Sequence, residues 1–179
     1  MALGATMRRF EIELADSDRD RYETIELRAA QHPSESDRYL AARVIARVME
    51  HAEGVEFSAG GVSSGDEPAI LQRDLRGDLR AWIEVGSPSP ERLHRASKLG
   101  ARVAIYGWRG DALAREIADT RVHRAEALEL FDLAPDFLDA IAATLDRANA
   151  WALSIADGAL YMTCNGVALE GAIRRVRLP

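Results

Sequence analysis

Apolar and polar residues alternate along the first part of the chain. Within residues 5–14 the apolar Phe10, Ile12 and Leu14 alternate with polar residues, and residues 22–27 repeat the alternation after the charged segment 16–20. A period of two is typical of strands with one buried face. The pattern therefore predicts an opening antiparallel hairpin at the edge of a sheet.

The apolar spacing changes to three and four residues after the second of these strands. Leu40, Val44 and Val48 fall on one side of a helix that we predict from Ser34 to about Glu50. Serine is a residue type that caps the free amides of a first helical turn, and Ser34 is placed to do so. We expect this helix to pack on the sheet.

Two segments that begin near a proline carry the next helix signals. Ser89 precedes Pro90, and Gly100 follows the last apolar position, so we predict a helix between them. Residues 135–148 predict an amphipathic helix and residues 111–118 a short one. In the helix predicted between Ser89 and Gly100 and the helix predicted over residues 135–148, the apolar positions expected to be buried are Leu93, Ala96, Leu99, Phe137, Leu138, Ile141 and Leu145.

Short apolar runs between the helices predict the strands of a central sheet. These runs are residues 55–57, 69–73, 79–85, 102–106 and 126–131. Residues 58–65 are rich in glycine and serine, which is typical of a loop. We expect this loop to lie beside a candidate site. The loop is therefore expected between the first two of these short strands.

The end of the chain predicts a three-stranded β-meander. Residues 151–178 contain two dipeptides, Asp157-Gly158 and Asn165-Gly166, that favour the positive φ angles of two-residue hairpin turns. We therefore expect one α/β (α+β) domain over residues 1–179. Its central mixed β-sheet is flanked by helices, and the opening hairpin and the closing meander are added to that core.

Composition and charge narrow the class of protein. The 179 residues are 47% hydrophobic and 29% charged and contain no run of about 20 apolar residues, so we expect a soluble protein with no membrane partner. Residues 1–6 lack the pattern of a secretory signal, and the lone Cys164 forms no internal disulfide, which predicts a cytoplasmic location. The net charge of −6 weighs against tight nonspecific binding of nucleic acid.

Several common chemistries are not indicated. The four histidines are scattered without a zinc-binding spacing, and no P-loop, dinucleotide-binding or serine-hydrolase motif is present, so we expect no organic cofactor. The tail arginines Arg174, Arg175 and Arg177 form the most basic cluster, which we interpret as a solvated strand face. The tryptophans are interpreted as core or rim residues rather than as stacking platforms for bases.

Four separated segments resemble a known family. They are His32-Pro33-Ser34-Glu35, Asp66-Glu67-Pro68, Trp82-Ile83-Glu84-Val85-Gly86 with Pro88 after it, and Asp157-Gly158. Together with the start of the chain they are similar to the YaeQ family, a divergent branch of the PD-(D/E)XK nuclease-like fold. The predicted order from position 34 to position 106 is helix, strand, strand, strand, helix, strand, which is the αβββαβ core of that fold.

The resemblance implies a site for Mg²⁺. Nucleases of this fold hold the ion with carboxylates, since a hard cation prefers oxygen ligands and can activate an attacking water. On this basis the candidate metal ligands are Glu35, Asp66, Glu67 and Glu84. Glu84 corresponds to the acidic residue of the (D/E)XK element, and Arg95 or Lys98 would stabilise phosphate charge, so the candidate catalytic residues are Glu84, Arg95 and Lys98.

The chain departs from the family motif at two positions. Gly86 stands where the motif has a lysine, so a cation would have to come from Arg95 or Lys98 on the next helix. Arginine neutralises phosphate but cannot act as a general base, because its guanidinium stays protonated. Ala69 follows Pro68 where the motif has aspartate, which leaves Asp66, Glu67 or Asp74 to supply that ligand.

Structural roles account for most of these residues equally well. Glu35 in a first helical turn interacts favourably with the helix dipole, and Arg95 can pair with Glu91 on a solvated face. Asp66-Glu67-Pro68 is also typical of an acidic turn. Glu84 differs, because it interrupts an apolar strand and shares a face with Trp82, where a buried carboxylate needs a metal, a cation or hydrogen bonds.

Two functional hypotheses follow from the resemblance. The first is Mg²⁺-dependent hydrolysis of nucleic-acid phosphodiesters at Glu84. The alternative is a catalytically inactive nuclease-fold module that binds nucleic acid or a protein partner. The arrangement of the four carboxylates separates them, because an enzyme needs these groups to converge on one ion.

Overall fold

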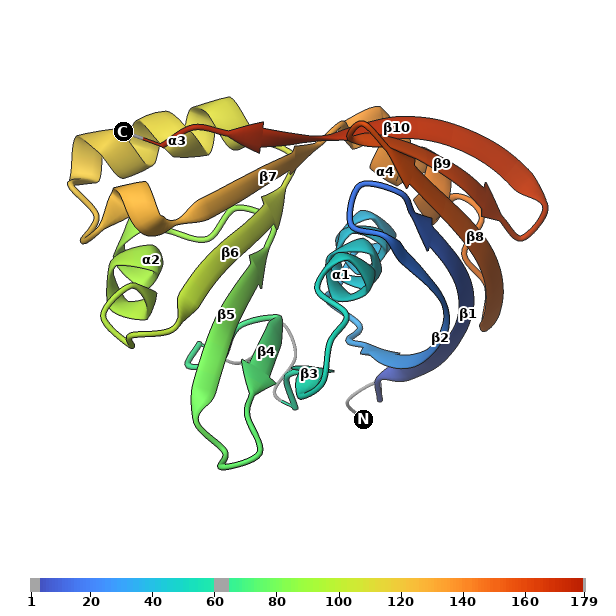
Figure 1. Cartoon of the computed structure of the whole chain (residues 1–179), viewed down its shortest axis with the longest axis horizontal. Helices are drawn as coiled ribbons and strands as arrows, with labels where there is room; N and C mark the ends of the chain where they lie inside the picture. The colour runs from blue at the N-terminus through green and yellow to red at the C-terminus, as the bar shows by residue number, and fades with distance from the viewer. Residues whose placement is uncertain (1–3, 60–64, 179) are drawn as a thin grey trace. The chain divides into compact units, whose positions relative to one another are not determined.

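The structure is a computed structural model that describes residues 4–59 and 65–178 (Figure 1). The predicted loop at 58–65 therefore lies mostly outside the described residues, as does the start of the family-like N-terminus. Chain contacts divide the molecule into two compact units. Unit 1 contains Met1–Ala41 and Leu133–Ile173, and unit 2 contains Ala42–Asp132 and Arg174–Pro179.

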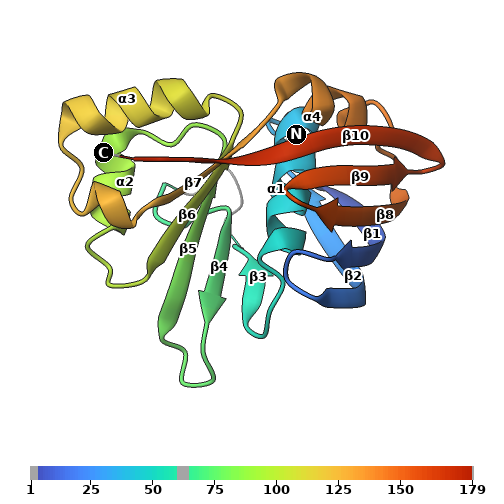
Figure 2. The ribbon, with the colours of Figure 1, turned by 45° about the horizontal axis from the view of Figure 1, so that its top comes forward.

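Unit 1 is built on two sets of consecutive antiparallel strands. Strands β1 (Thr6–Asp16) and β2 (Arg21–Gln31) form the predicted opening hairpin, with β2 at the edge. Strands β8 (Ala148–Ala156), β9 (Ala159–Cys164) and β10 (Val167–Val176) form the predicted meander and lie side by side in Figures 1 and 2. A parallel pairing of β1 with β8 joins the two sets.

The two meander turns have the conformation that their sequences favour. Asp157 and Gly158 have φ angles of 52° and 75°, and Asn165 and Gly166 have φ angles of 48° and 85°. Positive φ at both central residues matches the right-handed twist of the flanking strands. The predicted turn chemistry is therefore confirmed at both positions.

Helix α1 (Asp37–Met49) confirms the predicted helix but begins three residues after the predicted cap. The Oγ of Ser36, not that of Ser34, accepts a hydrogen bond from the Tyr39 amide at 3.1 Å. Ser34 instead contacts the Nδ1 of His32. The prediction of Ser34 as the cap is wrong because the segment before the helix closes its own turn, in which the Glu35 amide donates to the His32 carbonyl.

Helix α4 (Pro135–Ala142) is shorter than predicted. Its core positions Phe137, Leu138 and Ile141 are buried as expected. The helix stops because the following residues form a turn, in which the Asp146 amide donates to the Oδ1 of Asn149 at 2.9 Å. Residues 143–148 therefore lie outside the helix, and Leu145 is only partly buried.

Unit 2 carries the order of elements that the sequence predicts. Antiparallel strands β3 (Val55–Phe57), β4 (Ile70–Arg73) and β5 (Leu79–Val85) are followed by the parallel strands β6 (Arg102–Gly107) and β7 (Glu129–Leu133). Helices α2 (Pro90–Ala96) and α3 (Gly110–Thr120) contribute Leu93, Leu113 and Ile117 to a core shared with β6 and β7. This packing places the start of α2 beside the end of β5.

Two details of unit 2 differ from the prediction. Leu99 is 52% exposed rather than buried, because α2 ends at Ala96 and the chain turns away before reaching it. Strand β7 begins at Glu129, later than predicted, since the short 3-10 helix η2 (Ala125–Ala127) occupies the preceding residues after the left-handed Arg124. Neither change alters the order of the strands.

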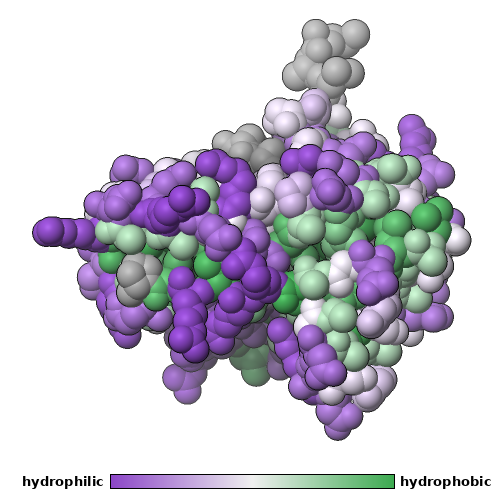
Figure 3. Space-filling model, turned by 90° about the horizontal axis from the view of Figure 1, so that it is seen from above, coloured by the Kyte–Doolittle hydropathy of each residue, from purple (hydrophilic) through white to green (hydrophobic). Residues whose placement is uncertain are grey.

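The strand pairings combine parallel and antiparallel neighbours. Within the described part of the chain, ten strands are hydrogen-bonded in the order β2-β1-β8-β9-β10-β7-β6-β5-β4-β3, and four α-helices accompany them. The chain is therefore an α+β protein with a mixed sheet. No helix in the ranges 4–59 and 65–178 is long and apolar enough to cross a membrane, and hydrophilic residues take up much of the face shown in Figure 3.

Replacing Gly171 with alanine should destabilise unit 1. An added Cβ at this position in β10 would lie 2.5 Å from Cγ of the Phe137 ring, where neither the strand nor the buried ring can move freely. We expect the Gly171→Ala free energy of unfolding to fall by about 1–3 kcal/mol in urea titrations. Gly4→Ala is the control, because no atom lies within 4 Å of its added Cβ. Equal stabilities of the two variants would contradict the close packing of Phe137 on β10.

Candidate functional site

Glu84 is a buried carboxylate near the end of strand β5. Glu84 is only 4% exposed, and its side chain lies on the same face of the strand as Trp82, as the alternation predicts. The indole Nε1 of Trp82 donates a hydrogen bond to the Oε1 of Glu84 at 2.6 Å. One neutral donor does not compensate a buried negative charge, so the carboxylate needs a cation.

Arg92 supplies that cation from the first turn of helix α2. Its Nε donates to the Oε1 of Glu84 at 2.5 Å, and its Nη1 donates to the carbonyl of Gly65 at 2.6 Å. Its Nη2 donates to the carbonyl of Glu67. The guanidinium carbon also lies 5.8 Å from the ring centroid of Trp82, within the range of a cation–π interaction. Arg92 thus binds strand β5, its own helix and the 65–67 loop together.

The sequence explains why Arg92 reaches Glu84. The Oγ of Ser89 caps the helix by accepting from the Arg92 amide at 3.3 Å, which fixes Arg92 in the first turn. Side chains of a first turn lie near the end of the strand that leads into the helix. The resemblance implies Arg95 and Lys98 as the cations, whereas the structure has Arg92 in this role. The helix start at Ser89 and Pro90 is the sequence signal that places Arg92 in the first turn.

The glycine that replaces the motif lysine has a backbone role. Gly86 has a φ of 88°, a left-handed conformation that side-chain-bearing residues rarely adopt. Its amide donates to the Tyr106 carbonyl at 2.8 Å, which ties the end of β5 to β6. A lysine at position 86 would therefore be strained in this backbone.

The other candidate acids of unit 2 lie in different surroundings. Asp66 is exposed, and Glu67 is partly buried and takes part in the site through its backbone carbonyl. Ala69 is a buried apolar residue. Asp74 stabilises the β4–β5 turn, where the Arg80 guanidinium bonded to it at 2.8 Å holds the pKa of its carboxyl below the usual value.

Glu35 belongs to unit 1 and closes a turn. Its Oε2 accepts a hydrogen bond from the His32 amide at 3.2 Å, and the residue is 7% exposed. The prediction that Glu35 lies in the first turn of the helix is wrong, because α1 begins at Asp37. Its carboxylate therefore acts in the chain segment before the helix.

A small hollow adjoins the Glu84–Arg92 pair. It has a volume of about 220 Å³, and the predicted residues Asp66 and Arg95 line it together with Arg92. Apolar surface comes from Trp82 and the exposed Leu99. Lys98 is exposed but does not line the hollow. We call this hollow the α2 pocket; its lining residues are Gly65, Asp66, Trp82, Arg92, Arg95, Ala96 and Leu99.

The candidate ligands do not gather into a metal centre. Within residues 4–59 and 65–178, no group of three or more His, Cys, Asp or Glu residues is placed to hold a metal ion. His94 and His123 are close, with ring centroids 6.2 Å apart, but the Nδ1 of His94 accepts from the His123 amide. These imidazoles therefore connect helix α2 to the segment that follows α3.

The acidic charge of the chain is unevenly divided. Unit 1 contains seven Lys and Arg against fourteen Asp and Glu, a net charge of −7, whereas unit 2 contains sixteen against fifteen, a net charge of +1. The predicted basic tail contributes little free charge, since Arg174 binds Asp132 at 2.9 Å and Arg175 binds Glu129 at 3.2 Å. The field around the α2 pocket is thus less repulsive to anions than the whole-chain charge suggests.

Replacing Arg92 with methionine should destabilise the protein strongly. The variant leaves the Glu84 carboxylate buried without its cation and frees two backbone carbonyls of the 65–67 loop. We expect the free energy of unfolding to fall by about 3–5 kcal/mol. The exposed Arg95→Met variant should change it by no more than about 0.5 kcal/mol in the same denaturant titration. Recovery in the Glu84→Gln/Arg92→Met double variant would confirm that the cost comes from the unpaired charge, and equal single-variant effects would contradict it.

Cys164 should be unreactive in the folded protein. Burial raises the pKa of its thiol from 9.0 to about 11, so the reactive thiolate is scarce at neutral pH. We expect a thiol reagent to label Cys164 much more slowly in buffer than in denaturant, as followed by the absorbance of the released product. Equally fast labelling in both solutions would show that the strand β9 cysteine is accessible.

Comparisons with known proteins identify one family of related sequences. A model of the family described as "YaeQ protein" matches residues 1–172. The chain is 28% identical to "Uncharacterized protein YaeQ" of Salmonella typhi over 91% of both chains and 27% identical to that of Escherichia coli, also over 91% of both.

Two crystal structures of YaeQ proteins share its architecture. The protein from Xanthomonas axonopodis pv. citri is 29% identical with a TM-score of 0.87, covering 98% of this chain and 99% of the other. The protein from Pseudomonas syringae is 25% identical with a TM-score of 0.88, covering 98% and 97%. Because both the matching family model and these crystal structures cover nearly the whole chain, this chain belongs to the YaeQ protein family.

Proposed function

We propose that this protein binds single-stranded nucleic acid at the α2 pocket and does so without metal-dependent cleavage at Glu84. The observation that carries the proposal is the set of bonds made by Arg92, which neutralises the buried candidate ligand Glu84 and leaves cationic and aromatic groups around a hollow. The PD-(D/E)XK-like order of α1, β3, β4, β5, α2 and β6 supports nucleic acid as the partner class.

The residues of the pocket do not fit a Mg²⁺ centre as they stand. The Oε1 of Glu84 already accepts from Trp82 and Arg92, and the guanidinium places a positive charge directly against the carboxylate. A divalent ion at Glu84 would have to displace Arg92 from three acceptors and overcome its positive charge. The ion pair therefore takes the structural place that a metal has in a nuclease.

The same surroundings suit a phosphate backbone with an unstacked base. Arg95 and Lys98 are exposed on the last turn of α2 and just after it, where they are available to phosphate oxygens. Trp82 and Leu99 offer apolar surface within the pocket itself. Aromatic platforms next to backbone cations are the usual means of binding single strands without reading their sequence.

Binding of a labelled single-stranded oligonucleotide tests the proposal. We expect fluorescence anisotropy to detect binding by the wild-type protein in the presence of EDTA. The Arg95→Ala/Lys98→Ala variant should bind more weakly, and the slope of log K against log salt should become shallower by about 1.4, corresponding to roughly 0.7 for each of two lost phosphate contacts.

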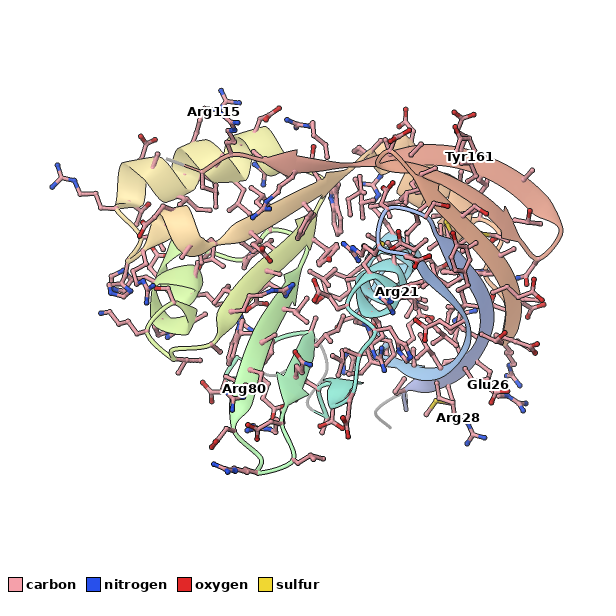
Figure 4. All side chains as sticks on the ribbon, in the orientation of Figure 1. Arg21, Glu26, Arg28, Arg80, Arg115 and Tyr161 are labelled. Atoms are coloured by element: carbon pink, nitrogen blue, oxygen red, sulfur yellow. The ribbon has the colours of Figure 1, made fainter. Side chains whose placement is uncertain are left out.

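Arg115→Ala serves as the matched control. Arg115 lies on α3 in the same unit, as labelled in Figure 4, but outside the α2 pocket. Its removal should leave both affinity and salt slope unchanged. Binding that is equal in all three proteins would refute the α2 pocket as the site. Cleavage of the oligonucleotide that depends on Mg²⁺ and disappears in Glu84→Gln would favour the metal-dependent nuclease instead.

A further inference from the structure

Three arginines surround a hollow in unit 1 and are distinct from the residues of the proposed nucleic-acid site in unit 2. Arg9 comes from β1, Arg28 from β2, and Arg147 directly precedes β8. The hollow has a volume of about 550 Å³, and its lining is completed by residues 5–7. No acidic side chain is among the described residues that line it, which is unusual in a unit whose net charge is −7.

The strand register holds these arginines together. Arg9 and Arg28 are direct partners across the antiparallel pair β1–β2, and both are exposed, while their neighbours Phe10 and Leu27 point into the core. The Arg9 amide donates to the Arg147 carbonyl at 2.8 Å, which brings the third arginine to the same end of the strands. Three cations are thus presented by a rigid part of the sheet.

The guanidinium groups of these three residues are not neutralised by the described protein. Four other arginines of unit 1 are engaged: Arg8 and Arg38 pair with Asp37 and Asp139, and Arg19 and Arg21 pair with neighbouring acids on their own strand or turn. Within residues 4–59 and 65–178, the guanidinium groups of Arg9, Arg28 and Arg147 take part in no ion pair or hydrogen bond. Like charges directly opposite each other destabilise a strand pair, and a bound anion would offset that cost.

A second hollow begins at the same two arginines. Its volume is about 740 Å³, and Arg9 and Arg28 line it together with Glu11 and Glu26, which are also direct partners across β1–β2. Figure 4 shows Glu26 and Arg28 projecting from the outer side of β2. The outer face therefore carries a pair of cations and, two residues along, a pair of carboxylates.

The amides in this second hollow have a structural role. The Nδ2 of Asn149 donates to the Arg9 and Asp146 carbonyls, and its Oδ1 accepts from Asn165. Asn165 in turn bonds the Thr144 carbonyl and the Ala150 amide. Because these side chains are already satisfied, the groups left to contact a ligand are the arginines and the glutamates.

We propose that unit 1 binds a small phosphate monoester, with its phosphate on Arg9, Arg28 and Arg147 and its hydroxyl groups on Glu11 and Glu26. Arginine presents several donors in a fixed fork that matches phosphate oxygens, and a monoester provides the nearly double negative charge that three cations favour. Both hollows have the volume of small-molecule sites. The inference does not rest on the nucleic-acid proposal, which concerns unit 2 alone.

Titration calorimetry with inorganic phosphate, ribose 5-phosphate and ribose tests this site. Wild-type protein should bind the two phosphates, with ribose 5-phosphate the tighter, and should not bind ribose. Arg9→Gln and Arg28→Gln should each weaken phosphate binding by about tenfold or more, since each removes charge-assisted hydrogen bonds. Glu11→Gln should weaken binding of ribose 5-phosphate relative to inorganic phosphate.

Arg21→Gln is the matched control, because Arg21 lies on the same strand β2 but pairs with Glu23. It should leave phosphate affinity unchanged. Thermal unfolding separates binding from folding: phosphate should raise the melting temperature of wild type but not of Arg28→Gln, whose own melting temperature should not be lower than that of wild type. The proposal would be overturned if inorganic phosphate or ribose 5-phosphate failed to bind wild type. It would also be overturned if Arg21→Gln and Arg28→Gln bound phosphate with equal affinity.

Adding an oligonucleotide to the same titrations distinguishes a small phosphate monoester from a nucleic-acid backbone as the ligand. If an oligonucleotide binds more tightly than ribose 5-phosphate and loses that affinity in Arg28→Gln, the small-molecule assignment is refuted in favour of a nucleic-acid backbone. Oligonucleotide binding that depends on Arg95 and Lys98 but not on Arg28 would support separate sites in the two units. The Arg95→Ala/Lys98→Ala variant should retain wild-type affinity for ribose 5-phosphate.

Discussion

The bond between Arg92 and Glu84 determines how the chain around the candidate site is arranged. A carboxylate inside an apolar strand is costly to bury, and the cost is compensated here by a guanidinium that also bonds two carbonyls of the 65–67 loop. The loop, the end of β5 and the start of α2 are therefore held by one side chain. Any ligand of the α2 pocket meets a surface that this ion pair has already organised.

The residues at the two positions that differ from the expected nuclease motif are consistent with this ion pair. At position 86 the backbone needs a left-handed φ, which favours glycine over lysine, and at position 69 a buried apolar site holds alanine. The positive charge that the motif places on the strand comes instead from the following helix. Each departure removes a group needed for metal chemistry, and together they leave a packed, neutralised pair.

Much of the fold could be predicted because local patterns determine it. Alternation located β1 and β2, Asn-Gly and Asp-Gly located the meander turns, and Ser89 with the proline after it located α2. The errors arose where a competing local hydrogen bond decides a helix boundary. Ser36 caps α1 instead of Ser34, and Asn149 accepts the hydrogen bond that closes the turn after α4. Such choices between neighbouring residues depend on which of several local hydrogen bonds forms, and the sequence pattern allows more than one.

The candidate sites were harder to predict, for a physical reason that differs between the units. In unit 2 the acid was identified but its partner was not, because the contact depends on how a helix turn packs against a strand end. In unit 1 the arginines are distant in sequence, and only the register of β1 with β2 and β8 brings Arg9, Arg28 and Arg147 together. Net charge pointed away from anion binding in both cases. A local group of unpaired cations interacts with a ligand over a few ångströms, where contact geometry outweighs the screened field of the whole chain. The acidic composition of this protein therefore restricts nonspecific attraction, but it leaves specific phosphate recognition open to those surfaces on which arginines are gathered by the sheet.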